Sequence, residues 1–214
     1  RVSVDIVADV ASSFINTHWN TYAFFVMYAR LDGFDANKDV PVNERPEIDR
    51  WVVSLLEQTV ETATEALDDY DALRAGAAIE AFVDQLSNWY VRRNRRRFWK
   101  AASGADKQAA YLTLYECLET VTRLLAPFVP FVAEALYQNL GRRVLADAPV
   151  SVHMTQWPAV HAERIDRQLL AETAVVQRVE VLGRAARNAS RLKVRQPLAR
   201  LLIRVPDDAA EAAV

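Results

Sequence analysis

The sequence predicts a mainly α-helical protein, an antiparallel helix bundle, and two observations support this fold class. Apolar residues recur every three or four positions in each long segment, which is the spacing of one helical face. Glycine is scarce, with five among 214 residues, and three of them, Gly33, Gly104 and Gly141, stand where predicted helices end. Helices joined by short connections pack as antiparallel neighbours in a bundle.

The first two helices are predicted from their apolar faces. The first has apolar residues on one face from Val7 to Ala29 and ends at Gly33. The second begins near Glu47 and carries an acidic outer face, on which like charges four residues apart repel each other. That face is interpreted as solvated, and a face that awaits a basic neighbour is the alternative. Its acidic residues are Glu57, Glu61 and Glu65.

Three further helices complete the predicted bundle. The third covers about 71–99, the fourth carries the apolar residues from Tyr111 to Leu125, and the fifth covers about 131–140. Pro127 and Pro130 separate the last two, because proline disfavours helix at the residue before it. These helices define a predicted bundle domain of residues 1–143.

The rest of the chain is predicted to be less regular. Residues 144–160 form an extended connector, and a long helix follows from about 166 to 192. Residues 198–205 have the apolar composition of a strand, yet no partner strand is visible in the sequence. Residues 161–214 are therefore interpreted as the start of a truncated C-terminal junction domain of α/β type.

Composition excludes several classes of protein. Apolar residues make up 51% and charged residues 25% of the chain, which is typical of globular domains rather than of disordered or collagen-like chains. The single cysteine, Cys117, cannot form an internal disulfide and is interpreted as buried filler. No apolar run reaches the roughly 18 residues of a membrane span, and no secretory leader is visible. We therefore expect a cytoplasmic protein without membrane contact.

The charges are distributed unevenly. The net charge is −2, yet residues 1–91 hold 6 basic and 16 acidic residues, whereas residues 92–214 hold 20 basic and 12 acidic. Such a division is typical of a polyanion-binding surface on an acidic body. The alternative is that the two halves are neighbours in one fold and neutralise each other.

A basic run follows the point where the charge changes sign. Six of the nine residues 92–100 are basic. With about 100° of rotation per residue, a regular helix continues the apolar face of residues 79–90 into three of these cations, Arg93, Arg97 and Lys100. Arg92, Arg95 and Trp99 then fall away from that face. Since an unpaired buried guanidinium is too costly, we expect some arginines to pair with acidic residues of the first two predicted helices and others to face a ligand.

The residue types in this run suit RNA. Arginine matches phosphate geometry, and arginine planes and tryptophan rings stack on unpaired bases. The alternatives are that the basic run has a purely structural role, or that it binds a membrane surface or an acidic protein partner. Residues 181–205 contain seven basic residues and no acidic residue. This segment is interpreted either as a solvated helix face with its linker or as a second contact with the same nucleic acid.

Several segments resemble isoleucyl-tRNA synthetases. Residues 88–99, Asn-Trp-Tyr-Val-Arg-Arg-Asn-Arg-Arg-Arg-Phe-Trp, are similar to the N-W-Y-x-R-x-N-R-R-R-F-W segment of that family. Residues 19–22 (Trp-Asn-Thr-Tyr), 124–131 (Leu-Leu-Ala-Pro-Phe-Val-Pro-Phe) and 193–198 (Lys-Val-Arg-Gln-Pro-Leu) match other family segments in the same order. The proline pair is general to class I synthetases, whereas the basic run is much more specific.

The resemblance implies a helix bundle of the class I synthetase anticodon-binding type. It implies that the fragment holds the anticodon stem-loop of tRNA(Ile) while the missing catalytic domain of the same chain uses ATP and Mg to charge the tRNA. The family's H-I-G-H and K-M-S-K-S motifs are absent from these residues, so no catalytic residue, metal site or cofactor is expected in the fragment, and a monomer is expected. The residues expected to contact RNA are Trp89, Arg92, Arg93, Asn94, Arg95, Arg96, Arg97, Trp99 and Lys100.

Two other functions remain open at this point. One is the equivalent domain of a valyl-tRNA synthetase, which shares the bundle and the proline pair. The other is a non-catalytic helical scaffold for protein interactions, whose basic run braces internal acids or docks a partner.

Overall fold

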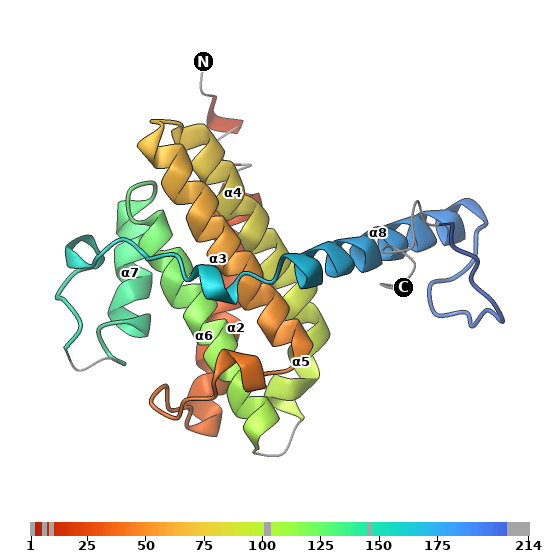
Figure 1. Ribbon diagram of the computed structural model, residues 1–214, viewed down its shortest axis with the longest axis horizontal. Coiled ribbons are helices and arrows are strands. Elements are labelled where there is room, and N and C mark those ends of the chain that lie inside the picture. The colour runs from red at the N-terminus through yellow and green to blue at the C-terminus, as the bar shows by residue number, and fades with distance from the viewer. Residues whose placement is uncertain (1–2, 6–7, 9–10, 101–103, 145–146, 205–214) are drawn as a thin grey trace. The chain divides into compact units, whose positions relative to one another are not determined.

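The protein is described from a computed structural model that covers residues 3–5, 8, 11–100, 104–144 and 147–204 (Figure 1). The chain divides into two compact units, residues 1–165 and 166–214. Helices dominate both units, and the described residues contain no β-strand. The predicted fold class, a mainly α helix bundle, is thereby confirmed.

The first unit is a bundle of antiparallel helices. A π-helical turn, η1 (Ala11–Ile15), leads into α2 (Asn16–Asp32), which ends at Gly33 in the left-handed conformation, with φ 64°. The helices α3 (Glu47–Asp68) and α4 (Ala72–Asp84) form a hairpin and lie side by side, as do α6 (Ala105–Leu125) and α7 (Pro130–Leu140) (Figure 1). The predicted start of the second helix near Glu47 and the predicted ends of the first and fifth helices at Gly33 and Gly141 agree with the structure, whereas Val7 of the predicted first helix lies outside the described residues.

The third predicted helix, 71–99, is in fact three consecutive elements. After α4 comes a seven-residue π-helical turn, η3 (Gln85–Val91), and then α5 (Arg92–Trp99). A π-helix bonds each residue to the one five positions away, so it holds more residues per turn than an α-helix. The path of the chain remains helical, but the faces on either side of η3 are no longer in the same phase.

Aromatic and aliphatic side chains fill the core between the helices. Phe25 and Phe34 contact Tyr111 with ring centroids 6.3 and 5.4 Å apart, and Phe98 meets the same ring at 5.1 Å. Cys117 is completely buried, and that burial raises the pKa of its thiol well above the ordinary value. The interpretation of Cys117 as buried filler is confirmed.

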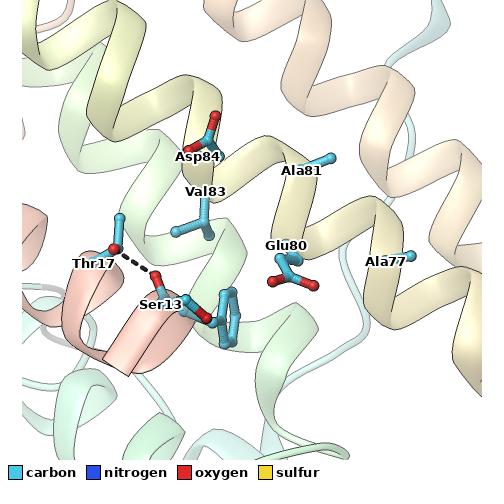
Figure 2. A pocket seen from close by; sticks show the side chains of 8 residues that line it. Ser13, Thr17, Ala77, Glu80, Ala81, Val83 and Asp84 are labelled. Carbon is cyan, nitrogen blue, oxygen red and sulfur yellow. Dashed lines mark hydrogen bonds between the residues drawn. The ribbon is translucent and has the colours of Figure 1, made fainter. Parts of the chain in front are cut away.

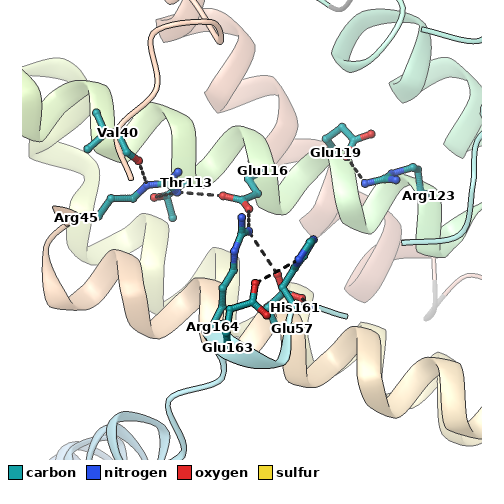
Figure 3. Close-up of polar contacts among 10 residues, drawn as sticks. All are labelled: Val40, Arg45, Glu57, Thr113, Glu116, Glu119, Arg123, His161, Glu163 and Arg164. Atoms are coloured by element: carbon teal, nitrogen blue, oxygen red, sulfur yellow. Dashed lines mark hydrogen bonds and ion pairs between the residues drawn. The ribbon is translucent and has the colours of Figure 1, made fainter. Parts of the chain in front are cut away.

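A crossing segment (residues 148–165) runs over α7, α6 and α3 (Figure 1). It contains two short 3₁₀ turns, η4 (Val152–Met154) and η5 (Ala162–Arg164). The Trp157 indole donates to the Thr64 hydroxyl at 2.9 Å, and Arg164 pairs with Glu116 at 2.6 Å. Glu116 also forms an ion pair with Arg45 at 3.0 Å, so its carboxylate links the crossing segment to the loop before α3 (Figure 3).

Glu57 corrects the prediction of a solvated acidic face on the second helix. Its side chain is 4% exposed, accepts the backbone N–H of His161 at 2.9 Å, and lies 3.6 Å from Arg164 (Figure 3). Burial raises the pKa of Glu57, and the neighbouring charges only partly offset this. The alternative, a face that receives a basic neighbour, is therefore correct at this position.

The second unit consists of α8 (Arg167–Ala189) and the segment after it. The Asp166 side chain caps the helix by accepting the Leu169 N–H at 3.0 Å. Arg187, in the last turn of α8, donates to the carbonyl oxygens of Lys193 and Gln196 in the segment that follows the helix. The strand predicted at 198–205 is wrong for residues 198–204, which form no regular structure, and Val205 lies outside the described residues. An isolated strand has no ladder to join, so its backbone groups gain nothing by extending.

Candidate nucleic-acid interface

The π-helical turn η3 decides which side of α5 faces the bundle. On a regular helix, Arg93, Arg97 and Lys100 continue the buried face. In the structure, the positions that continue it are Asn94, which is 5% exposed, and Phe98, which is fully buried. The extra residue held in η3 amounts to a rotation of about 100°, one residue of an α-helix. Arg93 and Lys100 are therefore exposed, which corrects the predicted continuation of the apolar stripe into cations.

Arg97 is the one arginine of α5 that the bundle holds closely. It forms a bidentate pair with Asp49, which is fully buried at the start of α3, with N–O distances of 2.6 and 2.7 Å. It also donates to the carboxylate and the carbonyl of Asp106, and to the Asn94 side-chain oxygen at 3.2 Å. These contacts engage all five N–H donors of a guanidinium. Arg97 thus has no donor left for a phosphate, and its contacts are those of a brace.

Two further groups complete the brace. The Tyr90 hydroxyl donates to Asp49 at 2.7 Å, and the Asn94 amide donates to the Tyr90 carbonyl oxygen at 2.9 Å. Burial, and then the charge of Asp49, raise the pKa of Tyr90 well above its ordinary value, so the hydroxyl remains a donor. The Asp49–Arg97 brace (Asp49, Tyr90, Asn94, Arg97 and Asp106) fixes α5 against the starts of α3 and α6.

The outward side of α5 forms a basic surface with aromatic groups at both ends. We define the α5 basic surface as its exposed cations, Arg92, Arg93, Arg95, Arg96 and Lys100. The Arg93 guanidinium lies 3.5 Å from the centroid of the half-buried Trp89 ring, and Arg95 lies 5.7 Å from that of Phe24. Trp99 is 58% exposed, with Lys100 at 5.7 Å from its ring.

The sequence-predicted site therefore separates into two groups. The structure brings together Trp89, Trp99 and the five exposed cations on the outside of α5, and it places Asn94 and Arg97 in the brace below them. Sequence reasoning missed Asp49, Tyr90 and Asp106 as the residues that hold the surface in position. The only signal was the expected pairing of arginines with acidic residues of the first two predicted helices, which include Asp49, but it named no individual residue.

The described residues contain no group of three or more His, Cys, Asp or Glu side chains that could hold a metal ion. No helix in the described part of the chain is long and apolar enough to cross a membrane. The chemistry offered by the α5 basic surface is cationic and aromatic, which suits the phosphates and unpaired bases of a nucleic acid.

A family model described as "Anticodon-binding domain of tRNA ligase" matches residues 49–203. The chain belongs to this family. The match begins at Asp49, the acidic partner of Arg97, and includes the whole α5 basic surface. The anticodon-binding domain therefore contains both the outward cations and the brace that orients them.

Individual relatives are isoleucine–tRNA ligases. The chain is 52% identical over 204 residues to that of Deinococcus radiodurans, a match that covers 95% of this chain and 18% of the relative. It is 49% identical to that of Dehalococcoides mccartyi and 44% identical to that of Thermus thermophilus, covering 95% and 96% of this chain and 20% of each relative. The chain thus spans about a fifth of the length of the curated relatives it matches.

Proposed function

We propose that this anticodon-binding domain holds the anticodon stem-loop of tRNA(Ile), as part of an isoleucine–tRNA ligase. The observation that carries the proposal is the α5 basic surface: five exposed cations, flanked by Trp89 and Trp99, on a helix whose sixth cation braces it from below. The choice of isoleucine rests on relatives at 44–52% identity that all carry this name.

Each residue of the site receives a role from its geometry. Arg92, Arg95, Arg96 and Lys100 contact phosphates, since their charged heads are exposed. Arg93 presents the free side of a guanidinium already stacked on Trp89, and Trp99 offers an open ring, so these groups stack on unpaired bases. Asn94 and Arg97 position the helix rather than touch the RNA.

The domain contributes binding, and the chemistry belongs to the larger ligase. Ligation of isoleucine to tRNA with ATP and Mg²⁺ takes place in a catalytic domain outside these 214 residues, and no residue here is catalytic. The domain holds the anticodon end so that the acceptor end reaches that distant site. As part of translation, the protein works in the cytoplasm, as a monomer.

The decisive experiment is a titration of the 214-residue chain with tRNA(Ile) at several salt concentrations, with the full-length ligase as positive control. Contact with about five phosphates gives a slope of log K against log salt near −3.5 to −4.5. Arg96→Ala, which removes a phosphate contact, should weaken binding and make the slope shallower by roughly 0.7–0.9. Arg93→Ala, which removes a stacking group, should weaken binding with little change in the slope. Glu44→Ala, which changes an exposed carboxylate of the loop before α3, is the matched control.

Unchanged affinity in Arg93→Ala, at low salt and in the full-length ligase, would contradict the proposed role of α5. Competition between tRNA(Ile) and tRNA(Val) separates this proposal from the valine enzyme's domain. A scaffold without RNA function predicts no preference for either tRNA over an unrelated one.

A further inference from the structure

A groove on the bundle lies between α4 and the residues of η1 and the start of α2, apart from the α5 basic surface. It encloses about 420 Å³, and Phe14, Ala77 and Ala81 supply apolar walls. Figure 2 shows Glu80 and Val83 on the side of α4 that faces Ser13 and Thr17. The small side chains at 77 and 81 are one helical turn apart, so they leave room for a partner side chain between the helices.

The groove continues into an exposed apolar end of the α3–α4 hairpin. Leu73 stands four residues before Ala77 on the same helical face, and its side chain is 84% exposed. Tyr70, in the turn, is 96% exposed and has a positive φ of 59°, which is unusual for a bulky residue. Exposed large apolar side chains beside an apolar groove are typical of an interaction surface. We call Tyr70, Leu73, Ala77, Glu80, Ala81 and Asp84 the α4 surface.

Charge identifies the kind of partner that fits the α4 surface. The Glu80 carboxylate makes no hydrogen bond or ion pair with other described residues, while Asp84 accepts a hydrogen bond from the Asn88 amide at 2.6 Å. Residues 75–91 contain no Lys or Arg. Such a surface repels phosphate, so it does not extend the nucleic-acid interface, and it attracts a basic protein segment.

The length of the relatives indicates where that segment comes from. The chain spans 18–20% of the isoleucine–tRNA ligases it matches, so most of a protein of that length lies outside residues 1–214. We propose that the α4 surface docks a segment of that larger polypeptide, with an apolar side chain on Leu73 and a Lys or Arg side chain whose stem lies along Ala77 and Ala81 and whose head reaches Glu80. The proposal rests on the proposed function in one respect, that the domain works within a larger ligase.

Photo-crosslinking in the full-length ligase tests this contact. The photoreactive residue p-benzoylphenylalanine is placed at position 77 in the groove, or at position 135, an exposed alanine of α7, as control. We expect crosslinked peptides from outside residues 1–214 for position 77, identified by mass spectrometry. Crosslinks confined to residues 1–214, or no excess over position 135, would overturn the proposal.

A charge reversal tests the chemistry of the partner. Glu80→Lys should lower the crosslink yield from position 77 at least tenfold, whereas Glu44→Lys, an equal change at another exposed carboxylate, should not. An equal yield from both variants would contradict a basic partner. Circular dichroism of each variant confirms that it is folded, which the exposed position of Glu80 favours.

The same variants keep the two proposals separable. In the 214-residue chain, Glu80→Lys should bind tRNA(Ile) no more weakly than the unsubstituted chain, because Glu80 is outside the α5 basic surface. Absence of the position-77 crosslink in a ligase that keeps Glu80, together with intact tRNA binding, refutes the docking surface alone. A crosslink without tRNA binding refutes the proposed function alone.

Discussion

The basic run contains two kinds of arginine, and their partners separate them. Arg97 uses all five donors on Asp49, Asn94 and Asp106, whereas Arg93 is stacked on Trp89 and open to solvent. Composition alone predicts that some arginines brace the fold, but it cannot say which, because the partners lie 9 and 48 residues away in sequence. Position in the fold therefore decides the role of each guanidinium.

Removal of Arg97 should destabilise the bundle. Arg97→Ala leaves Asp49 charged and fully buried without its bidentate partner, and breaking a buried pair in this way costs about 3–5 kcal/mol. Chemical denaturation followed by circular dichroism measures this change. Arg93→Ala is the comparison and should change the free energy of unfolding by less than about 0.5 kcal/mol. Equal effects of the two substitutions would contradict the brace.

His18 should make the stability depend on pH. Its side chain is 2% exposed, neither ring nitrogen has a hydrogen-bond partner among the described residues, and burial lowers its pKa to about 4. The unfolded chain, with a pKa near 6.5, binds the proton more readily than the native state. The contribution of His18 is therefore complete above pH 6.5 and falls as the pH drops toward 4, where about 3 kcal/mol is lost.

His18→Leu isolates this effect. Unfolding free energies of both proteins at pH 7 and pH 4 give the test, because carboxylates common to the two proteins cancel in the difference. We expect the unsubstituted protein to lose about 3 kcal/mol more than His18→Leu over this range. A parallel loss in both proteins would show that His18 does not contribute.

At the scale of elements, the order and approximate ends of the bundle helices follow from the sequence, and the phase of α5 does not. Apolar spacing identifies α2, α3, α6 and α7, because each buries one face against its neighbours. An expectation built on a constant rotation per residue does not reveal η3, because a π-turn adds a residue to the turn and so shifts the phase of every later side chain. The strand predicted at 198–205 was wrong because a segment with the composition of a strand forms one only where a sheet offers it a partner.

Two adjacent residues of α5 test its phase. Phe98→Ala should destabilise the protein by about 3–5 kcal/mol, since it empties a fully buried aromatic site. Trp99→Ala should change stability by less than about 1 kcal/mol and weaken tRNA binding instead, because the ring is 58% exposed. Thermal melts and a tRNA titration of both variants measure the contrast. A larger stability loss in Trp99→Ala would contradict the observed phase.

At the scale of the whole molecule, the uneven charge distribution acquires a partial explanation. The acids of residues 1–91 include Asp49, Glu57 and Asp32, which pair with bases from later in the sequence, so the two halves do neutralise each other in part. Most of the cations of residues 92–214 belong to the α5 basic surface and to the second unit, where residues 166–204 hold nine basic and three acidic residues. The domain limits predicted from sequence, 1–143, 144–160 and 161–214, remain a proposal.

A truncated chain tests the part played by the second unit. We expect residues 1–165 alone to unfold cooperatively, because that unit has its own core and crossing segment. Its binding to tRNA(Ile) should show a shallower salt dependence than that of the full 214 residues, since the cations of residues 166–204 are removed. Identical slopes would mean that these cations do not touch the RNA and belong to a solvated helix face.

The π-helical turn has a consequence for comparing members of this family. A single residue gained or lost between Gln85 and Val91 would turn every later side chain of the helix by about 100° while leaving the rest of the bundle unchanged. Two relatives could then carry the same string of arginines and present different ones to RNA. The position of a one-residue gap in an alignment of this helix would decide which arginines are equivalent, and percentage identity would give no warning of the difference.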